Sequence, residues 1–232
     1  MNFDVIRPMF GGSLLQSQVD GINTIIDEFE ESGNNSPITL AYLLATAKHE
    51  TADTMQPIHE RGAKAYFNKY EPGTQIGKNL GNTLKGDGFK FRGRGYVQLT
   101  GRANYAKAAK KIDRDLVADP DAALLPDVAA FVLIRGCIEG WFTGKKIGDY
   151  SRFVDMRRVV NGLDKANLIA SYADTFLRAL DTAPKSEPKP RTVPTEPPRE
   201  PYPEDAIAPP PAKSNWLAAL IQFILSLFKR RS

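Results

Sequence analysis

Residues 38–47 read Ile-Thr-Leu-Ala-Tyr-Leu-Leu-Ala-Thr-Ala, a run that is apolar on nearly every side of a helix. Ser36 and Pro37 precede it in the order expected of an N-cap and a first helical turn. A helix that is apolar all round is buried. The run therefore predicts a central helix that presents His49 and Glu50 at its C-terminal end.

The segments on either side of this helix also read as mainly helical. Apolar residues recur at helical spacing between residues 19 and 29, and Ser32 and Gly33 end that helix. A shorter helix is expected around residues 63–70, before a Glu-Pro-Gly turn. The later apolar patterns predict helices at about 102–112, 126–141, 151–160 and 164–181.

The exception is a glycine-rich stretch at residues 81–95. Its composition predicts turns and a hairpin that lead into a short extended segment at residues 96–100. The predicted fold class is therefore mainly α, an α+β arrangement in which a helical domain carries one small β-hairpin.

Proline usage divides the chain into three parts. Of the 17 prolines, 11 lie between Pro184 and Pro211, in a stretch without apolar periodicity. We therefore predict a helical domain at residues 1–182, an extended proline-rich linker at residues 183–213 and a short tail at residues 214–232.

Composition and charge exclude several classes of protein. The single cysteine rules out an intramolecular disulfide, and no apolar run reaches the ~18 residues of a membrane-spanning helix. The net charge is +4, but residues 1–182 hold 23 basic and 22 acidic side chains. A near-neutral body argues against nucleic-acid binding by this domain. The N-terminus lacks the basic and apolar regions of a secretory signal peptide.

The tail has the pattern of a helix at a membrane interface. Residues 216–228 form an apolar run of 13 residues with a narrow polar stripe, followed by Lys229, Arg230 and Arg231. We expect Trp216–Arg231 to be an amphipathic helix that contacts an anionic membrane surface. The alternatives are that this helix docks onto the body or self-associates.

Two glutamates are candidates for acid–base chemistry. Glu50 lies where the apolar helix ends, so partial desolvation should raise its pKa, and Glu60 follows ten residues later among polar groups. A protonated and an ionised carboxyl group form the pair that glycoside hydrolysis uses. The alternative is that both are solvated glutamates at helix ends.

Other motifs favour structural interpretations. The sequence His-Glu-Thr-Ala-Asp at residues 49–53 has Asp53 where a zinc protease has its second histidine, so we expect no metal site. Arg-Gly-Arg-Gly at residues 92–95 is a single copy and indicates a turn rather than an RNA-binding element. Cys137 lies on an apolar helix face and is expected in the core.

Residues 91–105, Phe-Arg-Gly-Arg-Gly-Tyr-Val-Gln-Leu-Thr-Gly-Arg-Ala-Asn-Tyr, resemble the core motif of glycoside hydrolase family 19, the chitinase-like and phage-endolysin group. Three further segments resemble the family in the same order, and the likeness covers roughly residues 14–182. It implies a lysozyme-like domain with a deep substrate cleft. The three segments are Ala-Lys-His-Glu-Thr (47–51), Ile-His-Glu-Arg-Gly-Ala-Lys-Ala-Tyr-Phe (58–67) and Arg-Arg-Val-Val-Asn-Gly (157–162).

The resemblance also implies roles for individual residues. Glu50 would be the general acid and Glu60 the general base of an inverting reaction, while Thr100 would hydrogen-bond the attacking water. No cofactor is implied. The residues implied to contact substrate are His49, Tyr66, Tyr96, Gln98, Asn104, Arg158 and Asn161.

The expected function is hydrolysis of the β-1,4 glycosidic bonds of peptidoglycan by a monomeric catalytic domain. The short interval between Glu50 and Glu60 and the absence of plant-type disulfides are more similar to phage endolysins than to plant chitinases. Such an enzyme would be made in the cytoplasm and reach the cell wall after membrane permeabilisation. The alternatives are a chitinase, or a non-catalytic sugar-binding module with a membrane-active tail.

Overall fold

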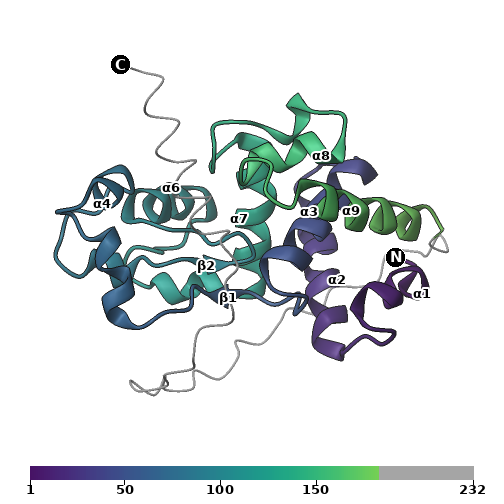
Figure 1. Ribbon diagram of the computed structural model, residues 1–232, viewed down its shortest axis with the longest axis horizontal. Helices are drawn as coiled ribbons and strands as arrows, with labels where there is room; N and C mark the ends of the chain where they lie inside the picture. The colour runs from purple at the N-terminus through teal and green to yellow at the C-terminus, as the bar shows by residue number, and fades with distance from the viewer. Residues whose placement is uncertain (183–232) are drawn as a thin grey trace.

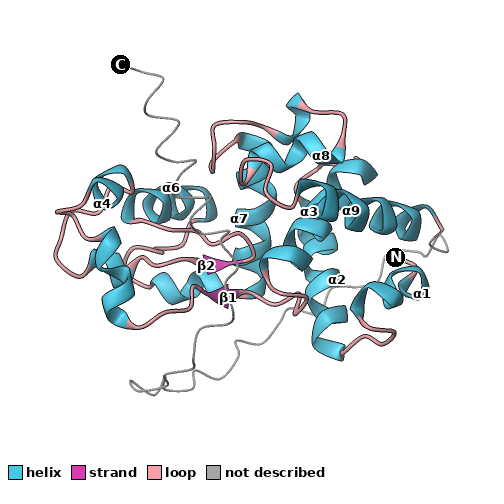
Figure 2. Cartoon of the chain, viewed as in Figure 1, coloured by secondary structure: helices cyan, strands magenta, loops and turns pink. Residues whose placement is uncertain are grey.

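The computed structural model describes residues 1–182 of the chain, and these residues are mainly helical with one small sheet (Figures 1 and 2). The predicted linker and tail helix lie outside the described residues. Within residues 1–182, no helix has the length and apolar character needed to cross a bilayer. The elements are α1 (Phe3–Ile6), α2 (Gln16–Glu31), α3 (Pro37–Glu50), β1 (Ile58–His59), α4 (Gln75–Asn79), α5 (Asp87–Lys90), β2 (Arg94–Gly95), α6 (Arg102–Ile112), α7 (Pro126–Glu139), α8 (Phe153–Met156) and α9 (Ala166–Asp181), with 3₁₀ helices at Arg7–Phe10, Lys64–Tyr70, Pro120–Leu124, Ile147–Asp149 and Arg157–Val159.

Helix α3 is the buried central helix that the sequence predicts. The Ser36 side chain accepts a hydrogen bond from the Thr39 amide at 3.2 Å, and Pro37 occupies the first turn. All residues from Leu40 to Lys48 are buried. Helix α9 packs along α3, and α2 and α7 also contact it. Burial on all sides explains why this helix has no polar face.

The other helix predictions hold, with differences at the ends. Helix α6 matches the expected range, whereas α7 stops at Glu139 because Gly140 adopts a left-handed conformation (φ 76°) and its amide bonds back to Gly136. The expected helix at 151–160 divides into α8 and a 3₁₀ turn. The segment around residues 63–70 is also a 3₁₀ helix.

The hairpin prediction for residues 81–95 is wrong in its position. That segment contains α5, and the tight turn instead lies between Arg94 and Leu99, whose backbones exchange hydrogen bonds at 2.8 and 3.2 Å. Residues 96–98, part of the segment at 96–100 that is expected to be extended, form this turn. Strand β2 pairs on its other side with β1, antiparallel, with Ile58 opposite Gly95.

Carboxylates from inside the fold order the glycine-rich segment. Both Glu71 oxygens accept backbone amides, from Gly86 at 2.8 Å and from Gly88 at 3.1 Å. The Asp87 carboxylate accepts the amides of Thr83 and Leu84 and pairs with the Arg102 guanidinium. These bonds satisfy backbone donors without a ladder, so the segment has no need of strand pairing.

Two groups of elements lie on opposite sides of α7 (Figure 1). Helices α1, α2, α3 and α9 form the larger group, in which the amide of Asn2 donates to the carbonyl of Ala179 at 2.8 Å. The smaller group runs from β1 to α6. Helix α7 contacts both, through α2 and α3 on one side and β2 and α6 on the other. Cys137 on α7 is fully buried, as predicted.

Gly21 on α2 should not tolerate a side chain. A Cβ atom at this position would overlap the carbonyl oxygen of Met55, in the turn that follows α3. We expect Gly21→Ala to lower the free energy of unfolding by about 2 kcal/mol, as overpacking does, although alanine favours helices. Urea unfolding measures this. Gly73→Ala is the control, because nothing lies within 4 Å of its Cβ position; equal stability of both variants would contradict the close packing.

Candidate active site

Five of the predicted site residues line one pocket. Glu50 enters it from the end of α3, Gln98 and Thr100 from the turn after β2, Asn104 from α6, and Asn161 from the segment before α9. The pocket therefore lies where the two groups of elements meet. The apolar part of its wall consists of Leu80, Val97, Leu99, Phe142 and Val160.

The Glu50 carboxylate is held from behind by a buried arginine. Arg157 Nη1 donates to Glu50 Oε1 at 2.6 Å, and Arg157 Nε donates to the carbonyl oxygen of Asp164 at 3.0 Å. The Arg157 side chain has no exposed surface, and that of Glu50 is 7 % exposed. One carboxylate oxygen is thus fixed, which leaves Oε2 for contact with a ligand.

The sequence prediction did not name Arg157, the residue that contacts Glu50. The prediction named its neighbour Arg158, but that side chain is 39 % exposed and lies 3.9 Å from Asp155. Arg158 is not among the residues that line the pocket. Two adjacent arginines in a short 3₁₀ turn carry no periodicity that indicates which one points inward.

A series of hydrogen bonds fixes the positions of the polar side chains in the pocket. Thr100 Oγ1 donates to the carbonyl of Gln98 at 2.8 Å, and Asn104 Nδ2 donates to the carbonyl of Thr100 at 2.7 Å. Gln98 has a left-handed backbone (φ 55°), and its Nε2 donates to the carbonyl of Ile58 at 3.1 Å. Gln98 Oε1 is buried without a hydrogen-bond partner in the described chain. Acceptor and donor groups of this kind suit the amides and hydroxyls of neutral sugars.

Glu60 does not line the pocket but lies directly behind its wall. Its Oε1 accepts from the Tyr70 hydroxyl at 2.9 Å and its Oε2 from the Gly93 amide at 3.1 Å. Gly93 separates Glu60 from Gln98, since a Cβ on Gly93 would lie 2.5 Å from Gln98 Oε1 and 3.2 Å from Glu60 Cβ. Only a glycine allows the two side chains to approach so closely.

The groups around Glu60 have shifted pKa values. Burial, together with the nearby carboxylate, raises the pKa of the Tyr70 hydroxyl, which keeps it a neutral hydrogen-bond donor. Burial also lowers the pKa of Lys69 to about 8, although Glu60 acts against this shift. Lys69 Nζ lies 3.8 Å from Glu60 Oε1.

The predicted aromatic contacts lie in two different environments. Tyr96 is fully buried and donates to the carbonyl of Met55 at 3.3 Å, so the prediction that it contacts substrate is wrong. Tyr66 is 38 % exposed, with Lys69 Nζ 3.4 Å from its ring centroid. It remains a candidate for stacking on a sugar.

The His49 side chain is half-buried beside the site, and it does not line the pocket. Burial lowers its pKa, while the adjacent Glu50 opposes this shift. His49 therefore remains a candidate substrate contact that lies beside the pocket rather than in its wall.

The truncated zinc-protease pattern has another explanation in the structure. The Asp53 carboxylate lies 2.5 Å from Nζ of the buried Lys48, which also lies over the Tyr172 ring at 4.3 Å. Asp53 therefore balances a buried charge. Within residues 1–182, no three His, Cys, Asp or Glu side chains are placed together to hold a metal ion.

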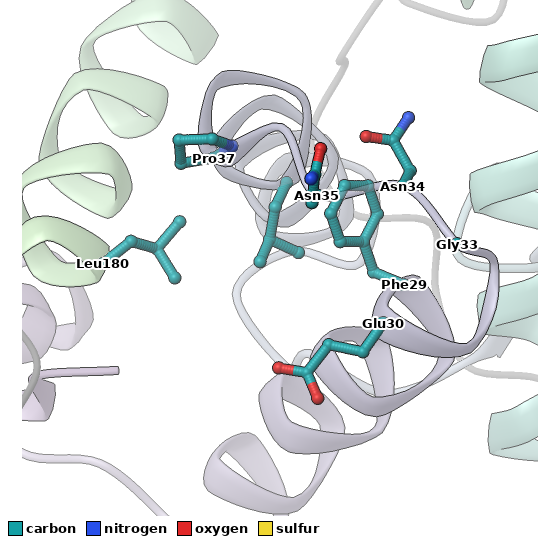
Figure 3. A pocket seen from close by; sticks show the side chains of 8 residues that line it. Phe29, Glu30, Gly33, Asn34, Asn35, Pro37 and Leu180 are labelled. Atoms are coloured by element: carbon teal, nitrogen blue, oxygen red, sulfur yellow. The ribbon is translucent and has the colours of Figure 1, made fainter. Parts of the chain in front are cut away.

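A second pocket lies between α2, α9 and the start of α3 (Figure 3). Phe29, Leu40 and Leu180 supply its apolar surface, and Glu30 is its one carboxylate. It offers no pair of groups for proton transfer, so we place the candidate active site in the pocket at Glu50.

Comparison with known proteins gives matches in sequence and in structure. A curated relative from Haemophilus influenzae, described as a glycosyl hydrolase family 19 domain-containing protein, is 50 % identical over 36 residues, which is 16 % of this chain and 18 % of the relative. Chitinase C from Streptomyces griseus has the same fold, with a TM-score of 0.55, 19 % identity and coverage of 77 % of this chain and 75 % of its own. The described chain thus has the fold of these chitinases, and a short segment of it is similar to a family 19 glycosyl hydrolase domain protein.

Two further structures support the family 19 fold. A chitinase C mutant aligns with a TM-score of 0.56 and 20 % identity, covering 77 % of this chain and 91 % of its own. A bacterial family 19 chitinase aligns with a TM-score of 0.52 and 19 % identity, covering 79 % and 96 % of the two chains. No family model matches the chain. The family 19 relative from Haemophilus is matched over less than a fifth of its length.

Removal of Arg157 should destabilise the domain. In Arg157→Met the Glu50 carboxylate would remain buried without its partner, and breaking a buried ion pair costs about 3 kcal/mol or more. We expect the free energy of unfolding, measured with urea at pH 7, to decrease by that amount. The double variant Glu50→Gln/Arg157→Met removes the unpaired charge and should recover part of the stability. A double variant no more stable than Arg157→Met would contradict the pairing.

His59 should make the stability of the domain depend on pH in the acidic range. Burial, and the positive charges of Arg94 and Arg92, lower the pKa of His59 to about 4 from its ordinary value of 6.5. The unfolded chain thus binds a proton between pH 6.5 and pH 4 that the folded chain does not, so stability should fall as the pH falls through this window. In His59→Gln the free energy of unfolding, measured with urea at pH 6.8 and at pH 4.5, should decrease less between these two pH values than in the wild type. An unchanged slope would contradict this assignment.

Proposed function

We propose that the protein is a peptidoglycan hydrolase that cleaves β-1,4 glycosidic bonds with inversion. The observation that supports this most is the pocket itself, which combines one oriented carboxyl group, Glu50, with the hydroxyl and amides of Thr100, Gln98, Asn104 and Asn161. A carboxyl group can supply a proton, and the amides and hydroxyl can bind uncharged sugars.

In the proposed mechanism Glu50 is the general acid. In the protonated form of Glu50, Oε1 would accept from Arg157, and the proton would reside on Oε2 and pass to the glycosidic oxygen as the bond breaks. The anchored oxygen restricts the rotation of the carboxyl group, so the proton is oriented before substrate arrives. Thr100 would hydrogen-bond the water that attacks the anomeric carbon.

Glu60 is the proposed general base. Tyr70 and the Gly93 amide orient its carboxylate immediately behind Gln98. To take a proton from water, Glu60 would exchange one of these hydrogen bonds for a water molecule when substrate fills the pocket. An inverting enzyme needs about 6.5–9.5 Å between its two carboxyl groups, so that this water fits between them and the sugar.

Chitin is the alternative substrate. The structures that share the fold are those of chitinases, and both polymers contain N-acetylated sugars joined by β-1,4 bonds. Mass spectrometry of digests separates the two functions. We expect new reducing ends on peptidoglycan fragments; products from chitin oligosaccharides and none from isolated cell walls would establish the chitinase. No glycosidic product from either polymer would favour a non-catalytic sugar-binding module.

Glu50→Gln should abolish activity without unfolding the protein. The amide oxygen can still accept from Arg157, but the side chain cannot donate the proton, and general acid catalysis contributes about 10²–10⁴-fold. The release of reducing ends from purified cell walls measures the rate, and thermal unfolding checks the fold. A variant with near wild-type activity would exclude Glu50 as the acid.

Substitutions at Glu60 and Thr100 should differ in severity. Glu60→Gln removes the base and should reduce the rate by about 10²-fold or more, whereas Thr100→Ala removes a group that only positions water and should cost less. Tyr70→Phe is the matched control, because it leaves the Glu60 carboxylate in place and removes one hydrogen bond. A Glu60→Gln enzyme that is more active than Thr100→Ala would contradict the proposed roles.

A further inference from the structure

The described residues have almost no net charge, but their positive and negative side chains are concentrated in different parts of the sequence. Residues 58–114 contain 13 lysines and arginines and only 4 aspartates and glutamates. Residues 1–57 and 115–182 together contain 10 basic and 18 acidic side chains. The segment from β1 to α6 therefore carries a net charge of +9, and the rest of the described domain a net charge of −8. We refer to residues 58–114 as the basic lobe.

The surface of the basic lobe is more positive than its net charge suggests. Three of its four acidic residues, Glu60, Glu71 and Asp87, are turned inward and accept hydrogen bonds from within the lobe. Asp113 is its one exposed acid. The exposed basic residues are Arg61, Lys64, Lys78, Lys85, Lys90, Lys107, Lys110, Lys111 and Arg114.

The basic lobe forms one wall of the candidate active site. Leu80, at the end of α4, and Asn104, on α6, both line the pocket. Lys78 precedes Leu80 by two residues. Lys107 lies one helical turn beyond Asn104, and its Nζ is 5.4 Å from the ring of Trp141, beside the pocket residue Phe142. We therefore expect a chain bound in the pocket to pass close to these lysines.

We propose that the basic lobe binds the carboxylates of the peptide stems that branch from the peptidoglycan strand. This inference rests on the proposed function. The pocket groups suit the uncharged sugars, and the lysines beside it suit anionic groups attached to those sugars. Chitin has no such groups, so the lobe would favour peptidoglycan over chitin. The acidic remainder of the domain would repel the same carboxylates and so restrict them to this wall.

The lobe is a weaker match to nucleic acids. Proteins that bind single strands interleave basic residues with aromatic side chains on which bases stack. The large exposed hydrophobic residues of the lobe are Tyr66 and Leu84, and Tyr66 lies beneath Lys69. The lobe therefore has the charge of a nucleic-acid surface without its stacking platform.

Charge substitutions provide the test, in the full-length chain carrying Glu50→Gln so that substrate is not consumed. The lobe variant is Lys78→Gln/Lys85→Gln/Lys107→Gln/Lys110→Gln. The control, Arg7→Gln/Lys146→Gln/Arg152→Gln/Arg178→Gln, removes four exposed charges from the rest of the domain. Both retain every residue that lines the pocket. Co-sedimentation with purified peptidoglycan sacculi measures binding, and thermal unfolding checks each fold.

We expect the lobe variant to bind sacculi about 10-fold more weakly than the parent at low salt, and the control to stay within about twofold. The difference should shrink above ~0.5 M salt, where exposed charges are screened. Sacculi with amidated stem carboxylates should bind both variants alike. Equal binding of both variants to untreated sacculi would overturn the proposal.

Other sources of negative charge give different results. If removal of phosphate polymers from the wall with hydrofluoric acid abolished binding while amidation did not, phosphate rather than carboxylate would be the ligand. Tighter binding to DNA than to sacculi at the same salt would also overturn the proposal. An active enzyme that cleaves chitin but not peptidoglycan contradicts the proposed function. One that cleaves peptidoglycan, while the two charge variants bind equally, contradicts only this inference.

Discussion

The ion pair between Arg157 and Glu50 is the constraint on which the site depends. It joins residues 107 positions apart and holds the end of α3 against the segment that leads into α9. Arg157 is fully buried, so its charge would be costly there without the Glu50 carboxylate and the Asp164 carbonyl. The same contact that stabilises this junction also orients the candidate acid, so its loss would affect both the stability of the domain and the proposed reaction.

Inward-facing carboxylates connect the order of the smaller lobe to its surface charge. Glu71 and Asp87 supply acceptors for the amides of a glycine-rich segment that has few side chains with which to form a core. Because these acids are used inside, the lysines and arginines outside have few nearby partners of opposite sign. A lobe organised in this way becomes a cationic surface beside the pocket.

The turn after α3 determines how the two glutamates are placed. Ala52, Asp53 and Met55 all have positive φ angles, which reverse the chain at once after the helix and direct it toward β1 and Glu60. The buried Lys48 binds Asp53 and thereby fixes the turn, while Gly21 leaves room for the Met55 carbonyl. The strained backbone is thus supported from two sides, as such conformations require.

The sequence alone determined the elements that depend on local backbone preferences and on the pattern of apolar residues. The run at 38–47 predicts a buried helix because it lacks a polar face, and the Ser36–Pro37 pair marks the start of this helix through local capping and backbone preferences. The grouping of Glu50, Gln98, Thr100, Asn104 and Asn161 in one pocket also agrees with the family resemblance.

Only the tertiary structure decided which of two neighbouring residues faces the site. Arg157 and Arg158 have similar chemistry, and only their burial separates Arg157, which contacts Glu50, from Arg158, whose side chain is 39 % exposed. The segment at 81–95 forms no hairpin, because an acceptor outside it, Glu71, binds the amides of Gly86 and Gly88, and the tight turn lies instead between Arg94 and Leu99. The uneven distribution of charge along the chain can be counted from the sequence. Only the fold shows that Glu60, Glu71 and Asp87 are turned inward, which leaves basic side chains at the surface of the basic lobe.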